Sequence, residues 1–489
     1  MKLKEILQGL KVIALQGDIA QEIRYITYDS RYVLPHSLFV AIKGAKHDGH
    51  QFITAALEKG AVGIISENPP PPEFAPIWIQ VEDAREALAL CAENFYGHPS
   101  REIKVVGITG TKGKTTVSYL LENILKAAHL QPGVIGTVSY RGPGLSSPAE
   151  RTTPEASDLQ RYLKILVDHG ATHCLMEVSS HALELKRVKG INFAVTIFTN
   201  LSGEHLDYHR TMENYYQAKK KLFTLYSSRM AVINYDDPWG KRLIEEIPTA
   251  AVTYGLHSRG TIYPENYHFS SRGIEATIKY PAGKFKINSP LLGRPNLYNI
   301  LAAAAAALTL GINPAFIKEG VQSITTIPGR FEKIENPWGI NIFVDYAHTD
   351  DALKNLLETV RELTPGRVIV VFGAGGDRDK TKRPRMGRVA AELADWSIIT
   401  SDNPRSEDPQ AIIADIEQGF KEAGKNNYEI EPDRRAAIRK ALLQAEKDDC
   451  LLIAGKGHED YQIIGRQVIP FHDPTVVKEL IQEIGRSRG

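Results

Sequence analysis

The chain has 489 residues, enough for roughly three domains of ordinary size, and its 43% hydrophobic and 24% charged residues exclude a disordered protein. Its 59 lysines and arginines nearly balance 58 acidic residues, giving a formal net charge of +1. This balance excludes a protein that binds nucleic acid or anionic membranes through its overall charge. Any anionic ligand must therefore be bound by a local arrangement of residues.

The first residues, MKLKEILQGLKVIALQGD, predict an amphipathic helix rather than a signal peptide, because Lys and Gln interrupt the apolar residues and no small-residue cleavage site is present. The longest apolar run, 300–308, is rich in alanine and shorter than the ~20 residues that a membrane span requires. Three well-separated cysteines without a CxxC pair indicate neither a disulfide framework nor a thiolate zinc site. We expect a cytoplasmic protein without a membrane span or a nucleic-acid partner.

Three blocks follow one another along the chain. Residues 1–98 contain short β-branched runs, turn signals and four prolines at 69–72 that predict an exposed loop. Residues 99–328 alternate apolar strands with helical patterns, which predicts a parallel sheet, and residues 329–489 repeat this alternation. The sequence thus predicts an α/β protein in which a small α/β domain precedes two larger α/β domains.

The strongest local signal is GITGTKGKTT at 107–116, which lies between an apolar strand and a strongly amphipathic helix. The backbone N–H groups of a glycine loop at a helix start can bind phosphate. Lys114 would then contact the terminal phosphates, and the Thr115 hydroxyl would bind Mg²⁺. Ile108 occupies the first glycine position of the general pattern GxxxxGK[ST], so the loop is a shorter variant. An incidental glycine turn is the alternative.

Acidic, histidine and lysine residues farther along have two interpretations each. Glu177 ends an apolar strand, where a carboxylate can face a nucleotide-bound metal or simply be solvated. His205 and His209 stand one helical turn apart, which suits zinc, but neither an HExxH motif nor a third ligand accompanies them, so structural loop histidines are an equal alternative. The three lysines of AKKKLF at 218–223 predict a solvated helix face.

Ten motifs occur in one order over nearly the whole chain: GTKGKTT, TTPE, EVSSHAL, NLSGEHLDYH, AKKKLF, GRPNLYN, GRFE, DYAHT, DNPRSEDP and GKGHEDYQ. Together they resemble the Mur ligases, the ATP-dependent amide-forming enzymes of peptidoglycan precursor synthesis, and most closely those that add the third residue of the peptide. The resemblance implies that residues 1–98 bind the uridine nucleotide, that 99–328 form a P-loop-type ATPase domain with a parallel sheet, and that 329–489 form a Rossmann-like domain for the incoming amino acid. It further implies ATP and Mg²⁺ as cofactors, and we expect a monomer.

The resemblance assigns ligands to residues that match these motifs. The uridine nucleotide and the muramoyl-dipeptide are assigned to Tyr28, Ser30, Ala45, Lys46, His47, Thr152, Thr153, Ser179 and Arg187. ATP is assigned to Gly110, Thr111, Lys112, Gly113, Lys114, Thr115, Thr116, Asn296, Arg330, Asp345 and His348. Three positions depart from the pattern: Arg151 where some relatives have Asn, Leu185 where some have Gln, and Asp350 where the family has proline.

The resemblance also implies that Lys114, Glu177, His205 and Lys219 are catalytic. Lys219 matches the lysine that the family carbamylates, and a carbamate turns a cation into an anionic oxygen ligand. Thr115, Glu177, His205 and carbamylated Lys219 would then hold the metal.

The amino-acid site is implied at Arg383, Asp402, Asn403, Pro404, Arg405, Gly455 and Glu459. The segment DNPR at 402–405 matches relatives that add meso-diaminopimelate, whose second carboxylate Arg405 can bind through two parallel hydrogen bonds. Glu459 suits an ammonium group. The alternative for DNPR alone is an Asx-Pro turn that carries a solvated arginine.

The implied reaction joins meso-diaminopimelate to UDP-N-acetylmuramoyl-L-alanyl-D-glutamate through an acyl phosphate. One alternative is the relative that adds L-lysine, against which Arg405 argues. Another is a folylpolyglutamate-type ligase, against which the N-terminal DSR and AKHDG segments argue. The alternative from another class is a P-loop NTPase switch without ligation. Phosphate release that requires both the muramoyl-dipeptide and the amino acid would separate the ligases from the switch.

Overall fold

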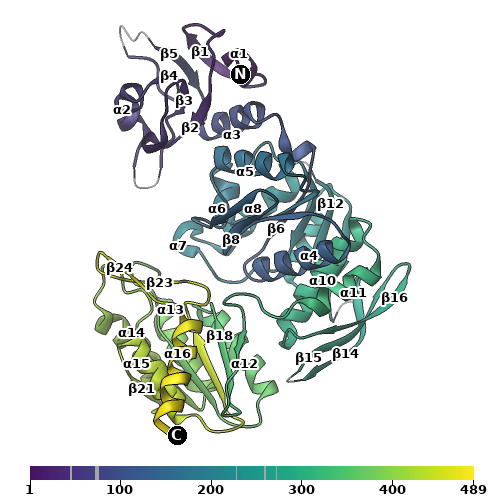
Figure 1. Cartoon of the computed structure of the whole chain (residues 1–489), viewed down its shortest axis with the longest axis vertical. Helices are drawn as coiled ribbons and strands as arrows, with labels where there is room; N and C mark the ends of the chain where they lie inside the picture. The colour runs from purple at the N-terminus through teal and green to yellow at the C-terminus, as the bar shows by residue number, and fades with distance from the viewer. Residues whose placement is uncertain (45–46, 72–75, 227, 258–259, 271, 489) are drawn as a thin grey trace. The chain divides into compact units, whose positions relative to one another are not determined.

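The computed structural model describes residues 1–489 apart from 45–46, 72–75, 227, 258–259, 271 and 489 (Figure 1). Its contacts divide the chain into two compact units. The first contains Met1–Leu201, Glu213–Tyr254 and Ala302–Ile317, and the second contains Ser202–Met212, Gly255–Leu301 and Lys318–Gly489. Each unit is therefore assembled from segments that are separated in sequence.

The N-terminal part of the first unit is a five-stranded sheet in the order β1-β5-β4-β3-β2, parallel except that β1 pairs antiparallel with β5. Its elements are α1 Leu3–Ile6, β1 Val12–Gln16, β2 Tyr25–Thr27, β3 Ser37–Val40, α2 Ile53–Glu58, β4 Ala61–Ser66, β5 Ile77–Val81 and α3 Ala84–Phe95. The predicted N-terminal amphipathic helix is wrong beyond its first turn. The β-branched pair at 12–13 enters a strand instead.

The second sheet of this unit has eight strands in the order β13-β12-β11-β6-β10-β7-β8-β9. They are β6 Lys104–Thr109, β7 Pro132–Ile135, β8 Ser139–Gly142, β9 Leu145–Pro148, β10 His173–Glu177, β11 Phe193–Phe198, β12 Ser228–Asn234 and β13 Ala251–Tyr254. The helices are α4 Lys114–Ala127, α5 Ala156–Asp168, α6 Ser180–Glu184, α8 Met212–Thr224 and α9 Pro238–Glu246. The first strand, β6, lies between β10 and β11. The strand order thus reverses at β6, and ligands of open α/β sheets bind beyond the carboxyl ends of strands at such a point.

The parallel sheet does not extend to residue 328 as predicted. Strands β8 and β9 are antiparallel, and after Tyr254 a separate antiparallel sheet contains β14 Tyr263–Ser270, β15 Gly273–Tyr280 and β16 Gly283–Ser289. Links as short as the one from Tyr280 to Gly283 can join only antiparallel neighbours. Helices α10 Gly293–Thr309 and α11 Pro314–Ser323 follow, and α10 buries the alanine-rich run. No described helix has the length and apolar character that a membrane span needs.

The second unit contains α7 Leu206–His209 and a six-stranded sheet in the order β17-β18-β22-β19-β20-β21. Its strands are parallel except β17 and comprise β17 Glu332–Ile334, β18 Asn341–Asp345, β19 Val368–Phe372, β20 Trp396–Ile399, β21 Tyr428–Ile430 and β22 Cys450–Ala454. Its helices are α12 Asp350–Leu363, α13 Lys382–Leu393, α14 Pro409–Glu422, α15 Arg434–Gln444 and α16 Asp473–Arg488, and a hairpin pairs β23 Tyr461–Ile464 with β24 Gln467–Pro470. The strand–helix alternation confirms the predicted Rossmann-like fold.

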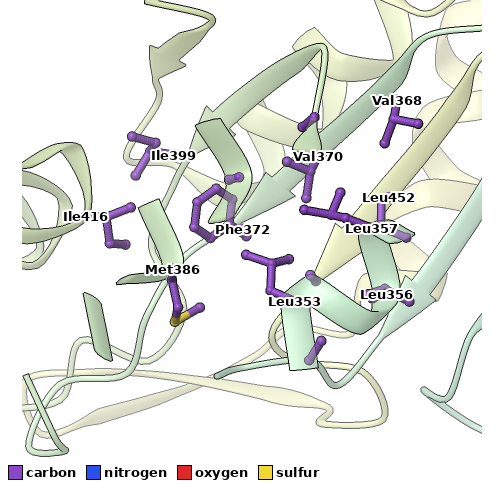
Figure 2. Packing of buried hydrophobic residues seen from close by; sticks show 14 of the residues in the cluster. Leu353, Leu356, Leu357, Val368, Val370, Phe372, Met386, Ile399, Ile416 and Leu452 are labelled. Carbon is purple, nitrogen blue, oxygen red and sulfur yellow. The ribbon is translucent and has the colours of Figure 1, made fainter. Parts of the chain in front are cut away.

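Helices cover both faces of this sheet. Successive side chains of a strand point to opposite faces, and β19 accordingly divides its residues between two cores. Val368, Val370 and Phe372 pack with α12, α13 and α14 (Figure 2). Ile369 and Val371 pack with α15 and α16. A strand buried on both faces explains the uninterrupted apolar run that the sequence shows here. It also fixes the carboxyl end of the sheet, where polar loops follow.

Candidate functional site

The predicted order of strand, glycine loop and helix is confirmed between β6 and α4. Gly110 has a φ of +148°, and Gly113, at +88°, is the residue that precedes α4. A Cβ at Gly110 would overlap the hydroxyl of Thr199. The loop therefore requires glycine at this position both for its backbone angle and for its close approach to the next strand end.

Residues after β11 hold the loop from the other side. The N–H of Thr111 donates to the Asn200 carbonyl at 2.8 Å, and the N–H of Lys112 donates to the Asn200 side chain at 3.0 Å. The Thr199 hydroxyl donates to the Lys112 carbonyl at 2.6 Å. Sequence reasoning noticed the motif that begins at Asn200 but gave these two residues no role. A polar pair directly after an apolar strand beside the loop strand was the available signal.

Lys114 and Thr115 begin α4 and face different partners. The Lys114 ammonium donates to the carbonyls of Gly110 and Thr111, each at 2.9 Å. The Thr115 hydroxyl donates to a Glu177 carboxylate oxygen at 3.0 Å. Thr116 is buried in the same turn. The loop thus brings an ammonium, a hydroxyl and a carboxylate together at the carboxyl ends of β6 and β10.

Glu177 is buried at the end of β10, with 1% of its surface exposed, so the solvated alternative is wrong. Besides Thr115, it accepts hydrogen bonds from the N–H of Thr137 at 3.0 Å and from the Thr137 hydroxyl at 2.9 Å. Sequence reasoning missed Thr137. Its hydroxyl also lies 3.1 Å from that of Thr152, which links the carboxylate to a residue assigned to the dipeptide.

The three lysines of AKKKLF do not share one solvated face, so that prediction is wrong for Lys219. Lys219 is 1% exposed, donates to the Gly110 carbonyl at 2.8 Å and lies 4.5 Å from the centre of the Tyr215 ring. Lys220 instead pairs with Glu246, and Lys221 with Glu184, each at 2.8 Å. Residue Lys219 alone points to the phosphate loop.

The two histidines of NLSGEHLDYH belong to the second unit and differ in exposure. His205 is exposed, has a φ of +58° and precedes α7, whereas His209 is buried. Among the residues that the structure describes, no three His, Cys, Asp or Glu side chains form a group that could hold a metal. A zinc site built on this pair therefore finds no support. Hydroxyl and carboxylate oxygens, as at Thr115 and Glu177, instead suit Mg²⁺.

The residues assigned to the uridine nucleotide lie in the N-terminal sheet region. Tyr28 donates its phenol hydrogen to Asp158 at 3.1 Å, and burial, followed by the nearby Asp158 charge, raises the pKa of Tyr28. Ser30 starts a short 3-10 turn, and its carbonyl accepts from Lys59 at 2.8 Å. His47 is exposed. The remaining assigned residues, Ala45 and Lys46, lie outside the described residues.

The residues assigned to the dipeptide surround the end of β10. The Thr153 hydroxyl donates to the Glu177 carbonyl at 2.8 Å and accepts from the Ser179 N–H at 3.1 Å. Ser179 precedes α6 and caps it by accepting from the Ala182 N–H. Leu185, one of the three positions that differ from the family pattern, directly follows α6. These contacts fix the backbone between Glu177 and α6.

Glu155 gathers arginines beside this segment. Its carboxylate pairs with the guanidinium of Arg187 at 2.9 Å and with that of Arg151, which differs from the family pattern, at 2.7 Å. The Arg85 guanidinium lies 3.5 Å away. Burial lowers the pKa of the Arg187 guanidinium even though Glu155 opposes this effect. One buried carboxylate thus faces three guanidinium groups, which leaves an excess of positive charge.

The residues of the second unit that the sequence assigns to ATP are held by local contacts. Asn296 donates to the Leu292 carbonyl at 2.9 Å. Asp345, at the end of β18, accepts from the N–H groups of Phe331 at 2.7 Å and Ala347 at 2.8 Å. Arg330 lies 4.8 Å from the centre of the Tyr346 ring.

Two further residues complete this stretch. His348 lies 3.6 Å from the Glu204 carboxylate, and its ring Nδ1 donates a hydrogen bond to the Tyr346 carbonyl at 2.8 Å. Asp350 starts α12 and pairs with Arg385 at 2.7 Å. An acidic residue in the first helical turn is favourable, so Asp350 is compatible with the helix start, as proline would also be.

The DNPR segment follows β20 and is tied to the β23–β24 hairpin. The Arg405 N–H donates to the Ile463 carbonyl at 3.0 Å, and the Arg405 carbonyl accepts from Gly465 at 2.7 Å. Its guanidinium is partly exposed and donates to the Gly376 carbonyl at 2.8 Å. Arg405 also has a φ of +54°, which non-glycine residues rarely adopt. Its partners are thus backbone carbonyls, which leave the guanidinium its charge for a ligand.

Arg383 differs from Arg405 although both were assigned to the amino acid. It is fully buried and pairs with Glu407 at 3.0 Å and Asp415 at 2.9 Å. It also donates to the Gly375 carbonyl at 3.2 Å. The structure thus places Arg383 behind the loop that carries Gly375 and Gly376, where it fixes that loop.

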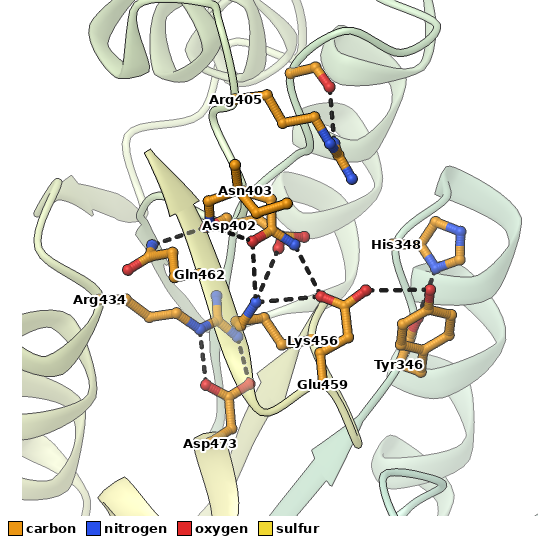
Figure 3. A network of polar contacts seen from close by, with 12 residues as sticks. Tyr346, His348, Asp402, Asn403, Arg405, Arg434, Lys456, Glu459, Gln462 and Asp473 are labelled. Atoms are coloured by element: carbon orange, nitrogen blue, oxygen red, sulfur yellow. Dashed lines mark hydrogen bonds and ion pairs between the residues drawn. The ribbon is translucent and has the colours of Figure 1, made fainter. Parts of the chain in front are cut away.

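Glu459 faces the DNPR segment from the loop after β22 (Figure 3). One carboxylate oxygen accepts from the Asn403 side chain at 2.8 Å and from Lys456 at 3.2 Å, and the other accepts from the Tyr346 hydroxyl at 3.4 Å. Gly455 leaves room for Asp402, whose carboxylate would lie 3.1 Å from a Cβ there. Pro404 is buried between Asn403 and Arg405. An anion and a guanidinium thus share this end of the sheet.

Family models match three stretches of the chain. Residues 22–96 match the Mur ligase family catalytic domain, 108–307 match the Mur ligase middle domain, and 329–457 match the Mur ligase glutamate ligase domain. The boundaries predicted after residues 98 and 328 stay predictions.

Full-length relatives agree with these models. The UDP-N-acetylmuramoyl-L-alanyl-D-glutamate–2,6-diaminopimelate ligase of Geobacter metallireducens is 45% identical, with 99% of each chain covered. A solved structure of a ligase of the same name is 33% identical with a TM-score of 0.71, covering 99% of both chains. A folylpolyglutamate synthase from Mycobacterium tuberculosis shares the fold at 18% identity and a TM-score of 0.62, covering 76% of this chain and 92% of its own. The chain belongs to the Mur ligase family.

Proposed function

We propose that the chain is an ATP-dependent ligase that adds meso-diaminopimelate to UDP-N-acetylmuramoyl-L-alanyl-D-glutamate in peptidoglycan precursor synthesis. The observation that carries the choice of amino acid is that the loops after β20 and β22, at the carboxyl end of the C-terminal sheet, carry both the partly exposed Arg405 guanidinium and the Glu459 carboxylate. A partly exposed guanidinium and a carboxylate match a ligand with an extra carboxylate beside an ammonium.

The phosphate loop supports ATP as the energy source. The N–H groups of Thr111 and Lys112 donate to Asn200, so the N–H groups at the start of α4 are the ones that favour phosphate oxygens. Lys114 can exchange its two loop carbonyls for a terminal phosphate. Thr115, Glu177 and a carbamylated Lys219 would hold Mg²⁺ in the first unit. When bound, Mg²⁺ reduces the repulsion between the anionic reactants. A metal role for His205 and ATP roles for Asn296, Arg330, Asp345 and His348 stay predictions from the resemblance.

The reaction must activate a carboxylate that water leaves unreactive. The D-glutamyl carboxylate attacks the γ-phosphorus, the bond to ADP breaks, and an acyl phosphate forms. The amine of the amino acid then attacks the acyl carbon, and the tetrahedral intermediate expels phosphate. Lys114 stabilises the charge that develops on the transferred phosphoryl group. The excess positive charge around Arg187 would attract the anionic dipeptide.

Arg405 decides between the two amino acids. The distal carboxylate of meso-diaminopimelate would accept two parallel hydrogen bonds from its guanidinium, whereas L-lysine has no such carboxylate. Glu459 would bind an ammonium that both amino acids carry. Selectivity thus depends on Arg405 and affinity for the amine on Glu459.

One assay tests this function. Purified protein receives ATP, Mg²⁺ and the muramoyl-dipeptide with meso-diaminopimelate or L-lysine, and the tripeptide is measured by mass spectrometry together with released phosphate. We expect product with meso-diaminopimelate and phosphate release that requires both substrates. Preference for L-lysine would refute the role of Arg405. Full-rate hydrolysis without the substrates would favour the NTPase switch.

We also propose a cytoplasmic monomer, as the sequence predicts. Light scattering during size-exclusion chromatography measures the mass of the particle, which should match the 54.2 kDa of one chain. A particle of twice that mass would contradict the proposal.

A further inference from the structure

Lys456 is a buried lysine to which the sequence motifs assigned no role. It follows β22, and its side chain is 0% exposed (Figure 3). Its ammonium donates to the Asn403 side-chain oxygen at 3.3 Å and to Glu459 at 3.2 Å, and it lies 3.8 Å from an Asp402 oxygen. All three neighbours belong to the proposed amino-acid site.

A second buried ion pair lies behind this cluster. Arg434 and Asp473 are both fully buried and share two hydrogen bonds, at 2.8 and 2.7 Å. Arg434 also donates at 3.0 Å to the carbonyl of Ala454, the last residue of β22. The pair thereby fixes the point at which the chain leaves β22 toward Lys456.

The charges of these groups determine what the cluster can bind. Asp473, Asp402 and Glu459 carry three negative charges, and Arg434 and Lys456 carry two positive ones. Burying a charge is costly unless it is paired, and Lys456 is enclosed by groups that accept its hydrogens. Among these five groups the acidic side chains outnumber the basic ones, and Glu459 is the acidic group through which we expect a cationic ligand to bind.

The Glu459 carboxylate has one constrained oxygen and one with spare capacity. The oxygen that faces Lys456 also accepts from Asn403, so two donors fix it. Among the residues that the structure describes, the other oxygen accepts from one donor, the Tyr346 hydroxyl at 3.4 Å, and a carboxylate oxygen can accept two hydrogen bonds. An ammonium can therefore bind at that second oxygen while the first stays fixed.

We infer that Lys456 is a positioning residue for the incoming amino acid: it holds Glu459 and Asn403 so that the second Glu459 oxygen receives the ammonium. This inference rests on the proposed function, since it deepens the role of the same site. Lys456 itself does not touch the ligand and acts through Glu459.

The first test is Lys456→Met, which keeps the length of the side chain and removes its donors. We expect the loss of these charged hydrogen bonds to raise the KM for the amino acid roughly 10- to 100-fold. We expect the KM for ATP and for the muramoyl-dipeptide, and kcat at saturating amino acid, to change by less than about threefold. An equal rise in all three KM values would indicate a merely structural role and overturn the inference.

The matched control is Lys440→Met, the same change at an exposed lysine of α15 that pairs with Glu431 at 2.7 Å. It should leave every kinetic constant unchanged. Circular dichroism and thermal unfolding establish that each variant is folded. If Lys456→Met does not fold, Lys456→Gln replaces it, because the amide retains hydrogen-bond donors without the charge. We expect this variant to fold and to raise the same KM by a smaller factor, and an unchanged KM would overturn the inference.

A double-mutant cycle tests the route of the effect. If Lys456 acts through Glu459, Lys456→Met should add less than about threefold to the KM in a Glu459→Gln background. Effects that multiply fully would show that the two residues act independently, against the inference.

The unmodified protein separates this inference from the proposed function. Ligation of L-lysine instead of meso-diaminopimelate would refute the proposed amino-acid choice, yet the KM ratios for L-lysine would still test Lys456, because both ligands carry the ammonium. Failure to ligate either amino acid would overturn both.

Discussion

The glycine loop after β6 and the proposed amino-acid site are shaped by different parts of the chain. The loop is shaped by backbone: glycine angles, N–H groups and the contacts of residues 110–112 with Thr199 and Asn200. The amino-acid site is shaped by buried charged side chains, with Lys456 and Arg434 at its centre. The backbone turn of the first site is encoded mainly in one contiguous motif, although Thr199 and Asn200 support it, whereas the side chains of the second are distributed over three loops. Substitutions should therefore damage the two sites in different ways.

The largest effect should come from Lys219→Ala, which removes a side chain that contacts the loop from outside. We expect kcat to fall by roughly 10³-fold, because the variant loses both the charge at the metal side and the donor to the buried Gly110 carbonyl. High bicarbonate should not restore activity, since no amine remains to be carbamylated. Lys220→Ala and Lys221→Ala, measured by tripeptide formation, are the matched controls. Near-normal turnover of Lys219→Ala would contradict the catalytic role of Lys219.

Gly110→Ala tests whether backbone geometry is what shapes the loop. The added methyl would overlap the Thr199 hydroxyl, so the loop must shift, and we expect kcat/KM for ATP to fall roughly 10²-fold. Gly424→Ala is the control, because Gly424 also has a positive φ, +65°, but has nothing within 4 Å of an added Cβ. That control should lose about 1 kcal/mol of stability and no activity. Equal losses of activity in Gly110→Ala and Gly424→Ala would show that the loss does not depend on the backbone geometry of the loop.

Arg405→Lys probes the site built from side chains. A lysine keeps the charge and loses the planar fork, so we expect the KM for meso-diaminopimelate to rise roughly 10-fold with the KM for ATP unchanged. Selectivity over L-lysine should narrow by the same factor. Arg388→Lys, at an exposed arginine paired with Glu422, is the control. Retention of full selectivity would mean that another group reads the second carboxylate.

The smallest effect concerns His173, which begins the strand that ends in Glu177. Burial, with a smaller contribution from Lys104, lowers the pKa of His173 to about 4, against about 6.5 in the unfolded chain. Between these values the unfolded chain binds a proton that the folded protein does not, so stability should decline as pH falls from about 6.5 to 4. His173→Gln should reduce this slope by up to about 1.4 kcal/mol per pH unit, measured by urea unfolding. An unchanged slope contradicts the assignment, and kcat at pH 7.5 should not change.

The fold was largely predictable because its strands are buried on both faces. The runs that contain β6, β10, β19 and β22 stand out as uninterrupted apolar segments, and the loop strand was identified together with its helix. The antiparallel β14–β16 sheet was not identified, since half-exposed strands carry a weaker signal and alternation of strands with helices had been assumed to continue. The predicted N-terminal helix was too long, because the lysines and leucines that follow α1 are also common in helices.

The sites were predictable where one residue acts within a motif. Lys114 and Thr115 lie at the loop, and Arg405 and Glu459 follow two strands of the same C-terminal sheet, while their roles toward a ligand stay predictions. Thr137 and Lys456 could not be found, because their roles depend on partners 40 residues away for Thr137 and 53 residues away in Asn403 for Lys456. Arg383 shows the opposite case. It matches a motif, but its guanidinium already pairs with Glu407 and Asp415 inside the protein.

The contact of Lys219 with the Gly110 carbonyl joins residues that are 109 positions apart. During synthesis on a ribosome at roughly 5 to 20 residues per second, the phosphate loop therefore emerges about 5 to 20 s before the lysine that supports it. The neighbours of β6 arrive in the same interval, because β10 and β11 are also made later. A nascent chain that ends before residue 219 lacks the contact of Lys219 with the loop. We therefore expect premature termination before residue 219 to yield a fragment without a complete nucleotide site.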